Sequence, residues 1–339
     1  MYHPRLQGNH FEMGYKYGSL MYKKGGRFES VISLSKEQLE FGVESLAACK
    51  ACYPEITEEI RGMAEGARYP FESFAAFLFN MGVVGDAYGC TCFCFQRGND
   101  IVFARNHDMF SDYKKTTESC LYRPSGGYTF LGQGDALIGK EDGVNEHGLA
   151  VGMTFVASTR AKPGLNFLFI VRCLLEKART ADEAIGLLRS LPISTAQNIV
   201  LADKTGDMAV VECCSQGIAV RRPVNGENFI IATNQFIDAS MTSWDHRPVP
   251  DWYSTQTRYR NVYQSLLESA TADSLQLAQD ILSGKCGFMC QYKKELRFDS
   301  LWSFVVRLND LEIRRAEGNP GKTKFVNDTR LDWAMEKSG

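Results

Sequence analysis

The 339-residue sequence has no long apolar run and almost no excess of charge of either sign. No stretch approaches the roughly eighteen apolar residues of a membrane-spanning helix, and the amino-terminal stretch lacks the apolar core of a secretory signal peptide. Lysine and arginine number 38 and aspartate and glutamate 40, a net charge of −2. This balance gives no electrostatic case for nucleic acid or an anionic membrane as a partner. We therefore expect a soluble, cytoplasmic protein.

Internal repeats and low-complexity linkers are also missing, and the length suits either one large domain or two smaller ones. Hydrophobic residues make up 44% of the chain, enough for a substantial core. The eleven cysteines are an odd number, which excludes complete internal pairing. In a reducing compartment most of them should be free thiols that pack as small apolar residues.

Helical patterns fill most of the first ninety residues. Apolar or small residues recur at helical spacing in residues 11–24, 33–54 and 55–82. Ser33 and Ser35 are candidate amino-terminal caps of the second helix, and Pro54 marks its end.

From Cys90 onward β-rich patterns take over. Two such runs meet at a glycine-containing turn over residues 97–100, so residues 90–108 predict a hairpin. Further strands are expected within residues 128–139, 143–157, 198–214, 217–223 and 300–318, and further helices within residues 165–178, 180–192 and 274–285. This order of elements favours an α+β layered architecture over a regular βαβ repeat.

Residues 316–323, "AEGNPGKT", match the loose pattern of a phosphate-binding loop. Such a loop needs a following helix, whose amino-terminal amides bind the phosphate, and further strands beyond it. Only sixteen residues follow this stretch, too few for the rest of a nucleotide-binding domain. We therefore expect a surface turn here.

The stretch "GCTCFCF" carries Cys90, Cys92 and Cys94 at alternating positions. On a strand these side chains share a face with about 6–7 Å between neighbours, too far for two of them to bind one zinc ion without a bulge. Cys49 and Cys52 lie at a helix end, without the strand-before-helix setting of a redox motif, and are expected to pack. We expect no metal and no cofactor.

A nucleophile is another interpretation of Cys90. A free thiol is mostly protonated at neutral pH and needs help to react. The predicted hairpin returns Arg105 and Asp108 alongside Cys90, where Arg105 would favour the thiolate and Asp108 would orient the group that carries the proton. On spacing alone, a core cysteine beside a strand-end ion pair fits equally well.

Several stretches occur in a characteristic order: "GNHFEMGYKYG", "YPEITEEIRGMAEGARYPFESF", "GCT", "ARNHD", "GVNEHGLAVGMTF", "ATNQF", "TRYR" and "LWSFVVRLNDLEIRRAEGNPG". Together they resemble the N-terminal-nucleophile (Ntn) amidohydrolases, in particular the linear-amide hydrolase group of choloylglycine hydrolases, penicillin V acylase and acyl-CoA:6-aminopenicillanate acyltransferase. The resemblance spans nearly the whole chain and is closest to the acyltransferase branch.

The resemblance implies a four-layer αββα sandwich. Residues 1–89 would form a helical leader, either a pro-segment or a small subunit, and residues 90–339 the catalytic domain. The chain would be cut between Gly89 and Cys90, and the freed α-amine, which titrates near pH 7.7–8.0, would act as the general base. A histidine base is then not required.

The same resemblance assigns the other site residues. Asp108 would hydrogen-bond the new α-amine, and Arg105 would stabilise the thiolate. Asn234 matches the amide that helps form the oxyanion hole. Arg258 matches a second site arginine, although a surface charge is the alternative interpretation. Thr154 stands where the bile-salt branch has an asparagine donor, so it is a substrate-binding candidate and the second oxyanion donor is open.

The remaining residues of the hairpin are expected to be structural. His107, adjacent to Asp108, should point to the opposite face of its strand. Cys92 and Cys94 should pack inward, and Phe93 and Phe95 should face the other sheet layer.

The implied function is hydrolysis of a linear amide bond in a small N-acyl compound, through an acyl-thioester on Cys90. An amine acceptor in place of water, or acyl-CoA as the donor, would make the enzyme an acyltransferase. The alternative is an uncleaved, catalytically silent relative that binds a small molecule. The acyl group, the amine and whether the chain forms a homo-oligomer are left open.

Overall fold

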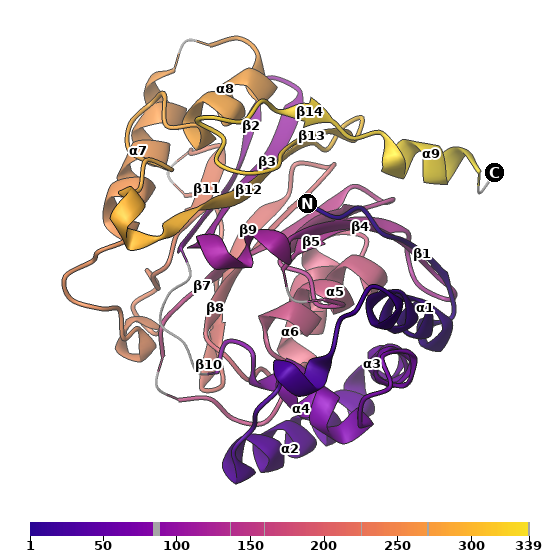
Figure 1. The fold of residues 1–339 in the computed structure, drawn as a ribbon. Helices are drawn as coiled ribbons and strands as arrows, with labels where there is room; N and C mark the ends of the chain where they lie inside the picture. Colours follow the sequence, from indigo (N-terminus) through magenta and orange to yellow (C-terminus); the bar gives the residue numbers. More distant parts are fainter. Residues whose placement is uncertain (84–88, 136, 159, 225, 270, 338–339) are drawn as a thin grey trace.

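The computed structural model describes residues 1–83, 89–135, 137–158, 160–224, 226–269 and 271–337 (Figure 1). Two β-sheets lie in the middle of the molecule, with helices on both outer sides. Residues 84–88, at the end of the expected leader, lie outside the described part of the chain. No helix among the described residues is long and apolar enough to cross a membrane.

The larger sheet has eight strands in the described residues, in the order β1-β4-β5-β6-β7-β8-β9-β10. They are β1 (Arg5–Gly8), β4 (Glu118–Pro124), β5 (Phe130–Gly134), β6 (Asp142–Asn145), β7 (Leu149–Phe155), β8 (Gln197–Asp203), β9 (Met208–Cys214) and β10 (Gly217–Arg221). The edge strand β1 pairs in parallel with β4, so the segment before Cys90 contributes a strand to this sheet.

The smaller sheet has six strands in the described residues, in the order β11-β2-β3-β12-β13-β14. They are β11 (Phe229–Ala232), β2 (Gly89–Arg97), β3 (Asp100–Phe110), β12 (Phe298–Arg307), β13 (Glu312–Ala316) and β14 (Val326–Asn327). The hairpin β2–β3 turns at Gly98, whose positive φ of 58° suits a residue without a Cβ. This hairpin lies at the centre of the sheet, between β11 and β12.

Helices form the two outer layers, as Figure 1 shows. On the side of the larger sheet are α1 (His10–Lys23), α2 (Lys36–Cys52), α3 (Pro54–Gly66), α4 (Phe71–Asn80), α5 (Phe167–Lys177) and α6 (Ala181–Ser190), which share one apolar core with it. On the side of the smaller sheet are α7 (Thr255–Glu268) and α8 (Ser274–Leu282). The short α9 (Arg330–Glu336) lies near the carboxyl terminus. The predicted αββα sandwich is therefore confirmed.

Local sequence signals account for several helix starts. Asn9 begins α1 with a capping box to Glu12, and Ser35 begins α2 with one to Gln38. The Thr180 side chain accepts a hydrogen bond from the backbone N–H of Glu183 at the start of α6. Of the two predicted serine caps, Ser35 is the one that the structure uses.

The two faces of β2 pack differently from the prediction. Cys92 and Cys94 lie in the core between the sheets, as expected. Phe93 and Phe95, however, pack against α7 and α8, so their expected contact with the other sheet is wrong. The reason is strand alternation: once the cysteine face meets the second sheet, the phenylalanine face must meet the helix layer. The sequence predicted that most of the eleven cysteines are free thiols. This is confirmed, because all eleven are free in the structure.

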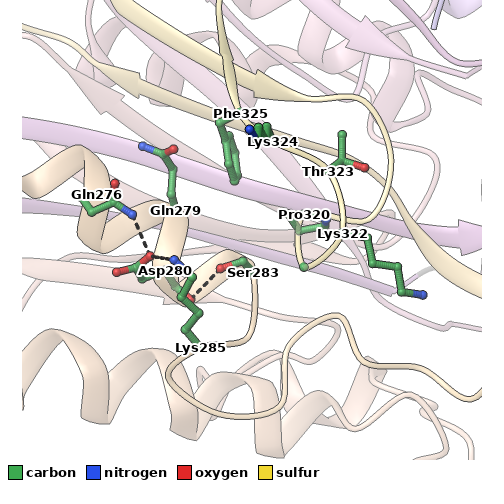
Figure 2. A pocket seen from close by; sticks show the side chains of 11 residues that line it. Gln276, Gln279, Asp280, Ser283, Lys285, Pro320, Lys322, Thr323, Lys324 and Phe325 are labelled. Carbon is green, nitrogen blue, oxygen red and sulfur yellow. Dashed lines mark hydrogen bonds and ion pairs between the residues drawn. The ribbon is translucent and has the colours of Figure 1, made fainter.

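The "AEGNPGKT" stretch leads into the strand β14 and not into a helix. Figure 2 shows Pro320, Lys322 and Thr323 among the residues that line a cavity beside α8. The volume of this cavity is about 300 Å³. The expected surface turn is only partly exposed, because Asn319 is buried and donates to the backbone carbonyl of Cys290. Without a helix amino terminus the turn lacks the amides that a phosphate-binding loop uses.

Candidate functional site

Strand register sets which side chains meet Cys90. In the hairpin, Gly89 stands opposite Asp108, Cys90 opposite His107 and Cys92 opposite Arg105. Directly opposed side chains of an antiparallel pair share a face. Cys90, Arg105 and His107 therefore point together toward the larger sheet, where the Cys90 side chain is fully buried.

A guanidinium lies beside the thiol. Arg105 Nη2 donates to Cys90 Sγ over 3.2 Å, while its Nε donates to the Met153 carbonyl at 2.8 Å and its Nη1 to Asp142 Oδ2 at 2.5 Å. Burial alone would lower the pKa of Arg105, but the neighbouring Cys90, Asp142 and Glu141 raise it. The hydrogen bonds to Met153 and Asp142 thus hold the permanently charged guanidinium of Arg105 next to Sγ.

His107 corrects the sequence interpretation. Its ring was expected on the face away from the site, but Nδ1 lies 3.9 Å from Cys90 Sγ and 2.6 Å from Glu141 Oε2. Nε2 lies 3.4 Å from Asp135 Oδ2, and the ring stacks on Trp302 with centroids 3.9 Å apart. Burial alone would lower the pKa of His107, but the Glu141 and Asp135 carboxylates raise it well above its usual range.

Asn234 and Arg258 hold the backbone of Cys90. The Cys90 N–H donates to Asn234 Oδ1 at 2.9 Å, and Arg258 Nη1 donates to the Cys90 carbonyl at 2.5 Å. Arg258 Nη2 also donates to Asn234 Oδ1 at 2.7 Å, which joins the two residues. Arg258 is fully buried, so the surface-charge alternative is wrong. The Asn234 Nδ2 donates to the Phe155 carbonyl at 2.9 Å.

Asp108 lies on the other face of β3, beside Gly89. Its carboxylate accepts hydrogen bonds from Ser300 Oγ at 2.5 Å and from the Tyr292 hydroxyl at 2.8 Å. Burial raises the pKa of Asp108, against the opposing effect of the Arg258 charge and of these two hydrogen bonds. The carboxylate is therefore held across the strand pair from the Gly89–Cys90 peptide bond.

Thr154 contacts the residue next to Asn234 in the chain. From β7, its hydroxyl donates to the Thr233 carbonyl at 2.6 Å and accepts from Asn198 Nδ2 at 2.9 Å. Asn198 also donates to the Thr233 carbonyl at 2.9 Å. Thr154 and Asn198 thus fix the residue that precedes Asn234.

Sequence reasoning did not single out Asp135, Glu141, Asp142 or Trp302 around the thiol. They come from loops and strands far away in the chain, and only the folded sandwich brings them together. His107, Asp135 and Glu141 have metal-binding atoms within 4.8 Å of one another. Each imidazole nitrogen faces one carboxylate, however, so the three residues form a chain of ion pairs.

The described geometry suits an acyl transfer. A thiol lies next to a fixed cation, its backbone N–H and C=O are both bonded to buried side chains, and a carboxylate stands across the preceding peptide bond. A buried cation stabilises a thiolate and the negative charge that develops when the thiol attacks a carbonyl.

Comparisons with known proteins bear on the family and on the fold of the chain. A family model described as acyl-coenzyme A:6-aminopenicillanic acid acyl-transferase matches residues 94–322, a range that begins just after Cys90. A search of the curated proteins finds no match.

Among solved structures, penicillin V acylase from Agrobacterium tumefaciens is 16% identical with a TM-score of 0.51, over 72% of this chain and 87% of that one. Conjugated bile acid hydrolase from Clostridium perfringens is 13% identical with a TM-score of 0.49, over 71% and 93%. The Caenorhabditis elegans N-acylethanolamine-hydrolyzing acid amidase ortholog is 17% identical with a TM-score of 0.47, over 65% and 93%. At such identities, the likeness to the acylase shows a shared fold.

Proposed function

Because the chain belongs to the acyl-coenzyme A:6-aminopenicillanic acid acyl-transferase family, we propose that it uses Cys90 as a nucleophile on the amide bond of a small N-acyl compound. One observation carries the proposal: the thiol, the N–H and the carbonyl of Cys90 are each bonded to a different buried side chain, Arg105, Asn234 and Arg258. Any buried residue needs partners for its backbone N–H and carbonyl, but a cysteine that only filled core space would not need a guanidinium at its thiol.

The first reaction in this proposal is cleavage of the chain itself. The Cys90 thiol adds to the Gly89 carbonyl, the peptide C–N bond breaks, and the thiol proton passes to the Cys90 nitrogen. The product is a thioester between Gly89 and the Cys90 side chain, which water hydrolyses to a Gly89 carboxylate and a free thiol. Cys90 then carries an α-amine that titrates near neutral pH and serves as the general base.

Turnover of a substrate repeats this chemistry. The α-amine takes the thiol proton, Sγ adds to the amide carbonyl, and the C–N bond breaks as the amine product receives the proton. Water releases the carboxylic acid from the thioester; an amine acceptor would instead give a new amide. Acyl-CoA could load the same thioester. Hydrolysis is the simpler of these outcomes, and it is the one proposed.

The other predicted residues have these roles in the proposal. Arg105 stabilises the thiolate, and Asp108 hydrogen-bonds the new α-amine once residue 89 has left. Asn234 Nδ2 exchanges the Phe155 carbonyl for the oxyanion of the intermediate. Arg258 holds Asn234 in place beside Cys90 by hydrogen bonds to both residues. Thr154 positions the segment that carries Asn234.

Denaturing mass spectrometry of the purified protein tests the proposal. The expected result is two fragments, one ending at Gly89 and one beginning at Cys90, together with release of amine from a panel of N-acyl amides. Cys90→Ala should remain one chain and release no amine. Cys92→Ala, which removes a neighbouring thiol from the same strand face, should cleave and turn over like the wild type.

An intact mass for the wild-type chain, with no turnover, would instead support the silent binding protein. Cleavage and turnover by Cys90→Ala at the wild-type rate would show that another residue is the nucleophile.

A further inference from the structure

The position of Gly89 is closed to any side chain. A Cβ placed on Gly89 would lie 2.9 and 3.0 Å from two ring carbons of Phe298 and 3.1 Å from the Cβ of Asp108. Real Cβ atoms essentially never approach a neighbour to less than 3.0 Å. Gly89 is the first residue of the extended strand β2, and the requirement for glycine argued here is one of space.

The ring of Phe298 has little freedom to move aside. It is 2% exposed and lies edge-to-face with Trp252, Tyr292 and Phe110, at centroid distances of 5.1, 4.9 and 5.7 Å. Asp108 is equally fixed, because its carboxylate is held by Ser300 and Tyr292. Close packing of this kind resists even one added methyl group.

Gly89 supplies the acyl group in the cleavage reaction proposed above. Its carbonyl carbon is attacked by Cys90 Sγ, and its Cα is the carbon next to that carbonyl. A substrate carbonyl must reach the same Sγ, which Arg105 holds in place. We infer that the α-carbon of the substrate takes the place that the Gly89 Cα has in the uncut chain, where Phe298 and Asp108 are the neighbours.

From this geometry we propose that Phe298 restricts the enzyme to acyl groups with an unbranched CH₂ next to the carbonyl. The inference rests on the proposed function, since it assumes that Cys90 attacks both Gly89 and the substrate. Straight-chain acyl amides and arylacetyl amides fit this class. Amides with a methyl group on the α-carbon do not, because that methyl would occupy the place of the excluded Cβ.

Self-cleavage gives the first test. Gly89→Ala should be cut at least about tenfold more slowly than the wild type, as expected for overpacking. Phe298→Ala introduced into the same chain should restore most of that rate, because it removes the obstructing ring. Gly217→Ala is the matched control: no atom lies within 4 Å of a Cβ at that strand position, so cleavage should be unchanged.

A pair of substrates gives the second test, which uses the unaltered chain. The 4-nitroanilides of hexanoic acid and 2-methylhexanoic acid differ only by the methyl group on the α-carbon. The wild type should favour the unbranched compound at least about tenfold in kcat/KM, and Phe298→Ala should bring the ratio toward one. Melting curves of each variant would establish that it is folded.

The outcomes separate the two proposals. A wild-type chain that is not cut and releases no amine contradicts the proposed function, and the inference falls with it. A wild-type chain that is cut, while Gly89→Ala is cut equally fast or the two anilides react equally well, contradicts only the restriction at the α-carbon. A preference that Phe298→Ala leaves unchanged would assign the restriction to another residue.

Discussion

At the scale of single residues, the surroundings of Cys90 are dominated by buried charge. Arg105 contacts its thiol and Arg258 its carbonyl, and Asp142 and Glu141 balance the charge of Arg105. Burial raises the pKa of Asp142, against the lowering effect of Arg105. Charges in a water-poor site act strongly over short distances, which is what the stabilisation of an oxyanion requires.

The proposed stabilisation of the oxyanion is easiest to test at Asn234. Asn234→Ala should lower kcat by about 100-fold, the usual effect of removing one oxyanion donor, with a smaller change in KM. The matched control is Asn228→Ala, which removes an exposed amide bonded to the Gln96 carbonyl near the far end of β2. Steady-state kinetics on the cleaved protein would measure both variants. An equal loss in the two would argue against a role for Asn234 in turnover.

At the scale of elements, sequence patterns located most helices and strands, and family motifs located Cys90, Arg105, Asn234 and Arg258. They could not fix the register of β2 against β3. The hairpin turn decides that His107 stands opposite Cys90, and a shift of one residue would have reversed every face. The four-residue strand β1 was missed because its pairing with β4 depends on a contact more than a hundred residues away.

Helix α7 was not predicted from the sequence, for a different reason. Its apolar face is narrow, with Val262 and Leu266 buried beside the polar Thr255 and Arg258. A helix whose buried face carries a charged residue gives a weak apolar period. The motif around Arg258 was therefore recognised without the helix that positions it.

Helix α5 is bound to the amino-terminal segment by buried charges. Glu176 on α5 accepts from Arg172 Nε at 3.0 Å and lies 2.9 Å from His10 Nε2 on α1, while Arg172 reaches Glu59 on α3 at 2.8 Å. Burial alone would raise the pKa of Glu176, but Arg172 and His10 lower it to about 2. A carboxyl group with a lowered pKa stabilises the fold above its unfolded pKa, and this contribution is lost as the pH falls toward 2.

Glu176→Gln should therefore reduce the free energy of unfolding by about 3 kcal/mol at pH 7, as for other broken buried ion pairs. The difference from wild type should shrink below about pH 4.5, where the unfolded carboxyl group becomes protonated. Urea unfolding at several pH values would measure it. The exposed pair of Glu58 and Arg61 offers the control, since Glu58→Gln should cost about 0.5 kcal/mol or less at any pH. A loss that does not depend on pH would contradict this account.

At the scale of the whole molecule, the segment before Cys90 is built into the fold. It supplies the edge strand β1, the helices α1 to α4 and a large part of one apolar core. We predict that after cleavage this segment stays bound as a small subunit. Native mass spectrometry should find a single particle containing both fragments, which separate only in denaturant. Two independent species in native buffer would contradict the prediction.

The tight fit of Gly89 against Phe298 and Asp108 also bears on when the protein becomes active. Under the proposed function, residue 89 occupies the place of the substrate acyl group as long as it remains attached, so the newly made chain would be a zymogen inhibited by its own backbone. In the proposed cleavage, release of that block needs water but no second protein molecule. Under the proposed function, activity should appear after a lag with first-order kinetics, and the half-time should be the same however far the sample is diluted.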